Sequence, residues 1–226
     1  MKSITLTLGL LLLSTGIAAA QDIPLSQILI EGENWKEKGV GKEFDLGTWF
    51  ANTKSGFDYH ISGGSLLGKG DTRLKLPEKL TKPSGMVLWP DDGTLVIGDA
   101  EGKHLWAFRV EKDGSLSSAD PYYALRMKPG EKASQVSALT VDDKGRLYAC
   151  TPLGIQVFDP TGRLSGVIEK PQEGKMTGIA FGGENGDLLL VAYGDKLFSR
   201  KMQGKRVKTE KPEPDTVKKD KPKDKE

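Results

Sequence analysis

The sequence predicts an all-β protein of the β-propeller type with about four recognisable blades. One pattern, in which short apolar runs alternate with tight turns, recurs along the chain, and no segment shows a convincing helical period. The copies begin near residues 46, 84, 137 and 178, and a spacing of about forty to fifty residues is typical of propeller blades. Because one such unit cannot bury both of its faces, we expect the units to stack radially.

The turns inside each copy predict where its strands end. The copy from Ser84 reads "SGMVLWPDDGTLVIGDAEGKHLWAFRV", the next begins at Ser137, and the third, from Gly178, reads "GIAFGGENGDLLLVAYGDKLFSRKM". Their turns, "PDDG", "DDKG" and "GENG", carry Asp or Asn close to Gly, which favours hairpins because Gly adopts a positive φ without steric cost. The pairs Asp91-Asp92 and Asp142-Asp143 are therefore interpreted as turn residues. A weaker copy from Leu46 turns at "NTKSG".

Three segments divide the chain. Residues 1–20 hold Lys2, a short apolar stretch and an Ala-x-Ala cleavage site, which together predict a signal peptide and an exported protein, whether periplasmic, cell-surface or extracellular. Residues 21–203 hold the repeats and are the expected propeller domain. Residues 204–226 hold mainly Lys, Glu, Asp and Pro, which predicts a disordered charged tail. The apolar stretch near the start is too short for a bilayer-spanning helix, so no membrane span is expected.

Composition narrows the function classes. The chain has 33 Lys and Arg against 31 Asp and Glu, so no overall field favours nucleic acid as a partner. Cys150 is the only cysteine and lies in a strand-like run, which predicts a buried inert thiol. The stretch "GGSLLGKG", from Gly63 to Gly70, lacks the Ser or Thr that follows the lysine of a phosphate-binding loop. We therefore interpret it as a turn-rich loop between blades.

Four stretches resemble a known family: "ILIEGENW", "PSGMVLWPDDGTLVIGDA", "VDDKGRLYACTPLGIQVFDPTGRLSGVI" and "IAFGGENGDLLLVAYGDKLF". The chain from about Gln27 to Lys201 resembles the senescence marker protein/gluconolactonase/luciferin-regenerating-enzyme-like propellers, in divergent and shortened form. The resemblance implies blades around a channel, six of them in the family, and a channel-bound divalent cation, commonly calcium. In the family this ion polarises a sugar lactone whose ring is hydrolysed.

The resemblance also maps the family's metal ligands onto this chain. A ligand Glu falls on Leu46, a ligand Asn on Ser84 and a ligand Asp on Ser137; Gly178 opens the last blade at the corresponding place. These four residues are the expected channel-lining equivalents. Calcium takes six to eight oxygen ligands and gains affinity from carboxylates. The sequence therefore predicts a degenerate metal site, no bound metal or other cofactor, and no convincing catalytic residue.

Two functions follow from this reading. The first is a binding or interaction module that takes a small, sugar-like ligand at the channel face or binds a partner through an exposed blade edge. The alternative is a hydrolase of sugar lactones or related esters that works through an unconventional site.

The few legible blades raise the question of how the ring closes, because an unpaired strand edge promotes association. One possibility is that "SQILIE", Ser26 to Glu31, pairs near "KLFSRKM" and closes a four-blade ring. The other is that the edge stays open for self-association or for a partner chain.

Overall fold

The computed structural model describes residues 24–40, 46 and 50–208, and it is an all-β propeller of four blades. Each blade is an antiparallel sheet of four strands. Blade 1 contains β2 (Phe50–Asn52), β3 (Asp58–Ser62), β4 (Ser65–Gly68) and β5 (Thr72–Arg73). Blade 2 contains β6 (Pro83–Leu88), β7 (Thr94–Asp99), β8 (His104–Val110) and β9 (Leu116–Ala124). The predicted fold class is therefore confirmed.

The remaining two blades differ in how they are assembled. Blade 3 contains β10 (Ala138–Val141), β11 (Leu147–Thr151), β12 (Gly154–Phe158) and β13 (Leu164–Ile168). Blade 4 contains β14 (Gly178–Gly182), β15 (Leu188–Tyr193), β16 (Lys196–Lys201) and, as its outer strand, β1 (Lys36–Val40). Two short 3₁₀ turns, Leu25–Gln27 and Lys69–Asp71, are the helical elements of the described residues, and none of those elements could cross a membrane.

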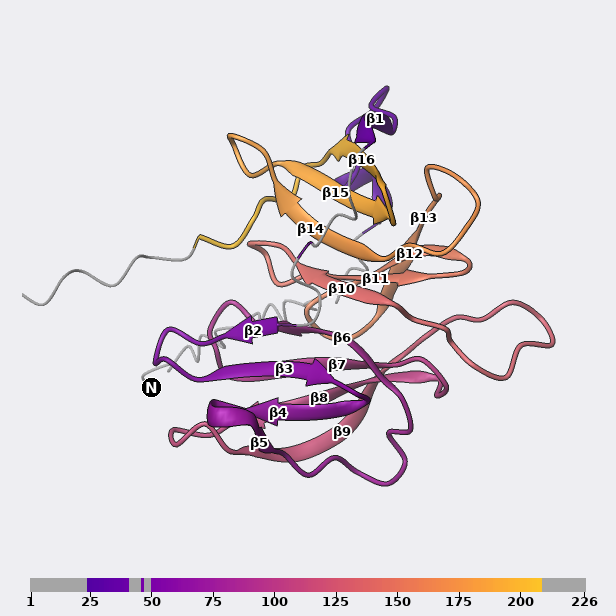
Figure 1. The fold of residues 1–226 in the computed structure, drawn as a ribbon. Coiled ribbons are helices and arrows are strands. Elements are labelled where there is room, and N and C mark those ends of the chain that lie inside the picture. Colours follow the sequence, from indigo (N-terminus) through magenta and orange to yellow (C-terminus); the bar gives the residue numbers. More distant parts are fainter. Residues whose placement is uncertain (1–23, 41–45, 47–49, 209–226) are drawn as a thin grey trace, which may run out of the picture.

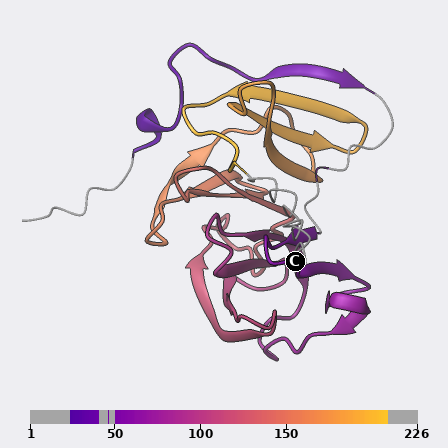
Figure 2. The ribbon, with the colours of Figure 1, turned by 90° about the vertical axis from the view of Figure 1, so that its left-hand side faces the viewer.

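The blades follow one another in an arc around a common axis (Figures 1 and 2). The innermost strands lie next to each other in the order β2, β6, β10, β14. Blade 1 and blade 4 stand at the two ends of the arc in Figure 2. Each inner strand runs from one end of the axis to the other, so residues that open these strands lie at the same end.

Apolar residues on alternate positions join each blade to the next. Leu95 and Ile97 of β7 pack in a cluster with blade 1, whereas Val96 between them packs in a cluster with blade 3. Side chains of neighbouring strand residues point to opposite faces, so blade 2 is covered on both faces. In the same way Ala149 faces blade 2 while Tyr148 and Cys150 face blade 4.

One stretch expected to be a loop is a strand. Ser65–Gly68 of "GGSLLGKG" forms β4, which pairs with β3 on one side and β5 on the other. Leu66 is fully buried against the blade 1 and blade 2 core. The interpretation as a loop between blades was wrong because the glycines mark turns within blade 1: Gly63 and Gly64 lie between β3 and β4, Gly70 lies between β4 and β5, and all three have a positive φ.

The N-terminal segment completes blade 4, but not through the strand that the sequence suggested. Within Ser26–Glu31, Leu29 forms a single bridge with Met202, and the Ile28 carbonyl accepts a hydrogen bond from the Gln203 amide. The strand that pairs along β16 is β1, which begins at Lys36. Because β1 lies on the outer edge of blade 4, it covers that edge and does not join blade 4 to blade 1.

The C-terminal segment stays on the domain beyond the expected boundary at residue 203. The Lys205 amide donates a hydrogen bond to the Asp143 carboxylate, and the Arg206 amide donates to the Gly186 carbonyl. Gly204 is buried against Asp142 and Arg146. The predicted signal peptide, residues 1–20, and most of the predicted tail lie outside the described residues.

We predict that Ile28→Ala lowers the free energy of unfolding by about 2–5 kcal/mol, the usual cost of emptying a well-packed aliphatic site. Ile28 is 0% exposed and packs in the core between blades 3 and 4. Urea denaturation of the protein from residue 21 onward measures the change. Glu31→Ala, at an exposed position of the same segment, is the control and should cost less than about 0.5 kcal/mol. Equal stability of the two variants would contradict this role of the N-terminal segment.

Candidate functional site

A cleft of about 700 Å³ opens at one end of the propeller axis. Blades 2, 3 and 4 contribute its walls: Lys82 to Ser84 span the start of β6, Gln135 to Ser137 lead into β10, and Gly174 to Thr177 lead into β14. The cleft is thus built from residues at equivalent positions of three successive repeats. Its volume lies in the range of small-molecule sites in proteins.

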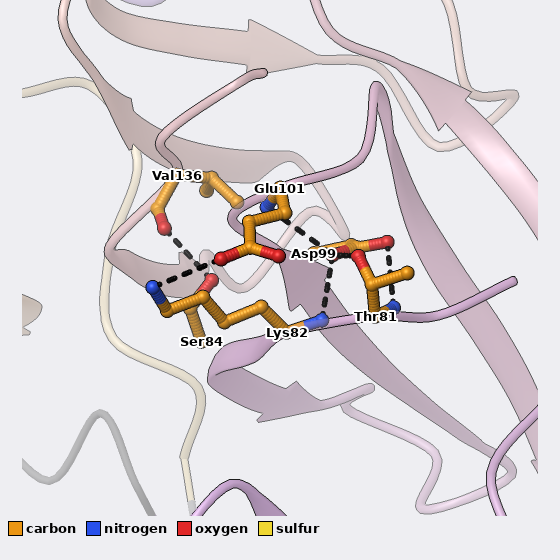
Figure 3. A network of polar contacts seen from close by, with 6 residues as sticks. All are labelled: Thr81, Lys82, Ser84, Asp99, Glu101 and Val136. Carbon is orange, nitrogen blue, oxygen red and sulfur yellow. Dashed lines mark hydrogen bonds and ion pairs between the residues drawn. The ribbon is translucent and has the colours of Figure 1, made fainter. Parts of the chain in front are cut away.

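Two serines of the cleft join one blade to the next. The Ser84 hydroxyl donates a hydrogen bond of 2.7 Å to the Val136 carbonyl (Figure 3). The Ser137 hydroxyl donates one of 2.7 Å to the Met176 carbonyl. Each acceptor lies two residues before the inner strand of the following blade. The serines are only 6% and 8% exposed, so they serve mainly as links between blades.

The other two expected positions, Leu46 and Gly178, contact each other. A Cβ atom placed on Gly178 would lie 3.2 Å from Cβ of Leu46, so the glycine allows the leucine to approach the start of β14. Neither residue lines the cleft, whereas the neighbouring Thr177 does. The Thr177 hydroxyl oxygen accepts a hydrogen bond from the Gly194 amide, which leaves its hydrogen available to a ligand.

A buried carboxylate fixes one rim of the cleft. Asp99, 1% exposed at the end of β7, accepts hydrogen bonds from the amides of Thr81, Lys82 and Glu101 and from the Thr81 hydroxyl (Figure 3). These bonds hold the segment that leads into β6 against the turn after β7. Asp99 therefore positions Lys82 and Glu101 at the cleft without facing a ligand itself.

A second buried side chain fixes the loop between blades 2 and 3. Gln156, 0% exposed on β12, accepts a hydrogen bond from the Arg126 amide and donates one to the Arg126 carbonyl. Sequence reasoning missed both Asp99 and Gln156. Asp99 had a signal, since it ends an apolar run directly before a glycine turn, whereas Gln156 lies in an unremarkable strand pattern.

The cleft is lined by more positive than negative side chains. Four lysines and two glutamates contribute to it: Lys82, Lys128, Lys170, Lys175, Glu101 and Glu173. Lys82 pairs with Glu101 at 3.2 Å, and Lys170 pairs with Glu173 at 2.8 Å. The hydrogen bond from Lys170 lowers the pKa of the Glu173 carboxyl, and the charge of Lys128 adds to this effect.

Acidic, histidine and cysteine side chains do not gather in the described part of the chain. No three of them lie close enough together there to hold a metal ion. At the expected ligand positions Leu46 offers a hydrocarbon, and the hydroxyl hydrogens of Ser84 and Ser137 are used on carbonyls. Cys150 is fully buried, and burial raises the pKa of its thiol, so it remains a protonated, weak nucleophile at neutral pH.

Comparison with known proteins shows which family the repeats match. The family model described as "SMP-30/Gluconolactonase/LRE-like region" matches residues 47–194, more than half of the chain. A gluconolactonase from Zymomonas mobilis is 27% identical over 127 residues, which are 54% of this chain and 35% of that protein. The chain thus spans about a third of the length of that relative.

Solved structures show the same fold at low identity. A putative gluconolactonase superposes with a TM-score of 0.57 at 16% identity, covering 75% of this chain and 64% of the other. A gluconolactonase from Xanthomonas campestris gives a TM-score of 0.53 at 20% identity, covering 68% and 56%. The calcium-binding protein regucalcin from Agrobacterium tumefaciens gives 0.57 at 17% identity, covering 70% and 61%. The chain therefore spans less than two thirds of each of these structures.

We predict that Ser137→Ala lowers the free energy of unfolding by about 1–3 kcal/mol, because the buried Met176 carbonyl loses its hydroxyl donor. Ser137→Thr keeps a hydroxyl and should recover part of the loss. Ser62→Ala, at an exposed position of blade 1, is the control. Urea denaturation measures all three variants, and a Ser137→Ala protein as stable as the parent would show that this hydroxyl does not join blades 3 and 4.

Proposed function

Since the chain belongs to the SMP-30/Gluconolactonase/LRE-like family, we propose that it is a binding module of that fold rather than a metal-dependent lactone hydrolase. Its site is the cleft at the axis, and its ligand is a small, sugar-like molecule. The cleft supports this proposal through its volume and through polar groups that remain free to bind, among them the Thr177 hydroxyl.

One observation carries the proposal: the positions that resemble the family's metal ligands hold Leu46, Ser84 and Ser137. Leu46 has no side-chain oxygen. The two serines are neutral and their hydrogens are committed to the carbonyls of Val136 and Met176. Calcium needs several oxygens, preferably from carboxylates, to offset its dehydration. These residues do not fit the ion, so no step of a metal-assisted hydrolysis is assigned to them.

The alternative is a hydrolase of sugar lactones or related esters, and the match to a gluconolactonase favours it. It would require a water activated by a group other than a metal ion. The ionisable side chains that line the cleft are lysines and glutamates, and both glutamates are paired with lysines. This pairing favours the binding module.

We predict that the protein from residue 21 onward binds Ca²⁺ with a dissociation constant no tighter than about 1 mM and hydrolyses D-glucono-1,5-lactone no faster than buffer does. Calorimetric titration and a pH-stat assay measure the two quantities. A related lactonase assayed in parallel shows that both methods detect a functioning site. Micromolar Ca²⁺ binding, or turnover that a chelator abolishes, would favour the hydrolase.

We also propose that the protein acts outside the cytoplasm. The basis is the sequence of residues 1–20, in which Lys2 precedes an apolar stretch and Ala18, Ala19 and Ala20 precede Gln21.

We predict that expression of the full chain in a bacterium with a general export pathway yields a mature protein that begins at Gln21. Intact-mass analysis of the periplasmic fraction measures the cleavage. Ala20→Asp is the matched variant, because a charged residue at the cleavage site should leave the leader attached. Recovery of the uncleaved parent chain in the cytoplasm would overturn the proposal.

A further inference from the structure

Two of the lysines in the cleft form no ion pair within the described part of the chain. Lys82 and Lys170 are paired with Glu101 and Glu173. Lys128 and Lys175 also line the cleft and are exposed, and neither forms an ion pair with a residue of the described ranges. With four lysines and two glutamates in the lining, the cleft carries a formal excess of two positive charges.

These two charges come from different sides of the cleft. Lys128 lies in the segment between β9 and β10, and Lys175 lies in the segment between β13 and β14. The positive charge of Lys128 helps to lower the pKa of the Glu173 carboxyl. Lys128 therefore interacts electrostatically with the segment between β13 and β14, which carries both Glu173 and Lys175. An anion bound between the two segments would therefore experience both lysines.

The rest of the lining suits a hydroxylated ligand. Thr177 has a hydroxyl hydrogen available, and Gln135 contributes an amide side chain. The lining contains no aspartate, and both of its glutamates are already paired. A neutral sugar could use the polar groups but would leave the excess charge uncompensated, whereas a carboxylate on the sugar would compensate it.

We propose that the cleft selects anionic sugars, such as a uronic acid, over neutral sugars, and that Lys128 and Lys175 hold the anionic group. The inference rests on the proposed function, because it names the ligand class of the same cleft. The two lysines act as binding residues through charge, and no bond of the ligand is made or broken.

The test compares two ligands that differ in one group. Methyl α-D-glucopyranosiduronate carries a carboxylate where methyl α-D-glucopyranoside carries a hydroxymethyl group. Calorimetric titration of the protein from residue 21 onward should show the uronate binding about three- to tenfold more tightly at low ionic strength, the preference expected from two exposed charge contacts. The preference should shrink in about 0.5 M salt as these charges are screened.

Matched variants identify the lysines. Lys128→Gln combined with Lys175→Gln should abolish the preference for the uronate, so that both sugars bind with similar affinity. Lys79→Gln combined with Lys112→Gln removes the same number of charges at exposed positions outside the cleft, and should keep the preference.

The outcomes separate this inference from the proposed function. Equal binding of both sugars, without salt dependence, would overturn the anionic preference and leave the binding module standing. Binding of neither sugar would overturn the proposed sugar-binding cleft itself. A preference that survives in the double variant of Lys128 and Lys175 would overturn the assignment of these two lysines.

Discussion

Packing of one blade against the next is the interaction on which the rest of the structure depends. The central strands are apolar on both faces, as β7 shows with Leu95 and Ile97 toward blade 1 and Val96 toward blade 3. A sheet of this composition cannot leave either face in water without a large hydrophobic cost. Stacking the blades covers these faces and brings the first residues of β6, β10 and β14 together, so the cleft is a geometric consequence of the core.

The two ends of the arc satisfy this constraint differently. On blade 1 the face opposite the core carries Phe50, His60 and Leu67, which lie in one row across β2, β3 and β4. Phe50 is 57% exposed, and the His60 side chain lies next to the Asp71 carboxylate. On blade 4 most residues opposite those of the core are small or aliphatic: Gly178, Ala180, Leu188, Leu190, Ala192 and Leu197, with Ser199 and Lys201 on the same face. Leu46 lies on this face, against Gly178. The N-terminal segment therefore packs on blade 4, the end of the arc with the more apolar face. Completion of the ring by a second chain stays a prediction.

Repetition made the blades predictable from sequence, because each hairpin turn is a local signal that depends on a few residues. Contacts between distant segments lack such a signal. The strand Lys36–Val40 has few apolar residues, since it lies on the outer edge of blade 4, and its pairing with β16 could not be inferred from its pattern.

Asp142 was predicted as a turn residue, and its carboxylate does accept hydrogen bonds from the amides of Lys144 and Arg146. Its other oxygen pairs with the Arg146 side chain at 2.6 Å in a buried site that Gln27 and Gly204 cover. The shape of the cleft could not be inferred from the sequence either, because it depends on how three distant segments lie relative to one another.

Ser84 and Ser137 stand at positions that match the family's metal ligands. The hydrogen bonds through which these side chains stabilise the fold compete with metal binding. A serine hydroxyl can donate a hydrogen bond to a carbonyl, as Ser84 and Ser137 do, whereas an ionised carboxylate can only accept one. An aspartate at position 137 could offer oxygens to a cation but would leave the buried Met176 carbonyl without this donor. The same side chain cannot supply both interactions. Hydroxyl-to-carbonyl bonds thus join blades 2, 3 and 4 at this end of the axis through the protein's own groups. Under the proposed function, the lysines and glutamates that line the cleft supply the charges that a ligand would meet.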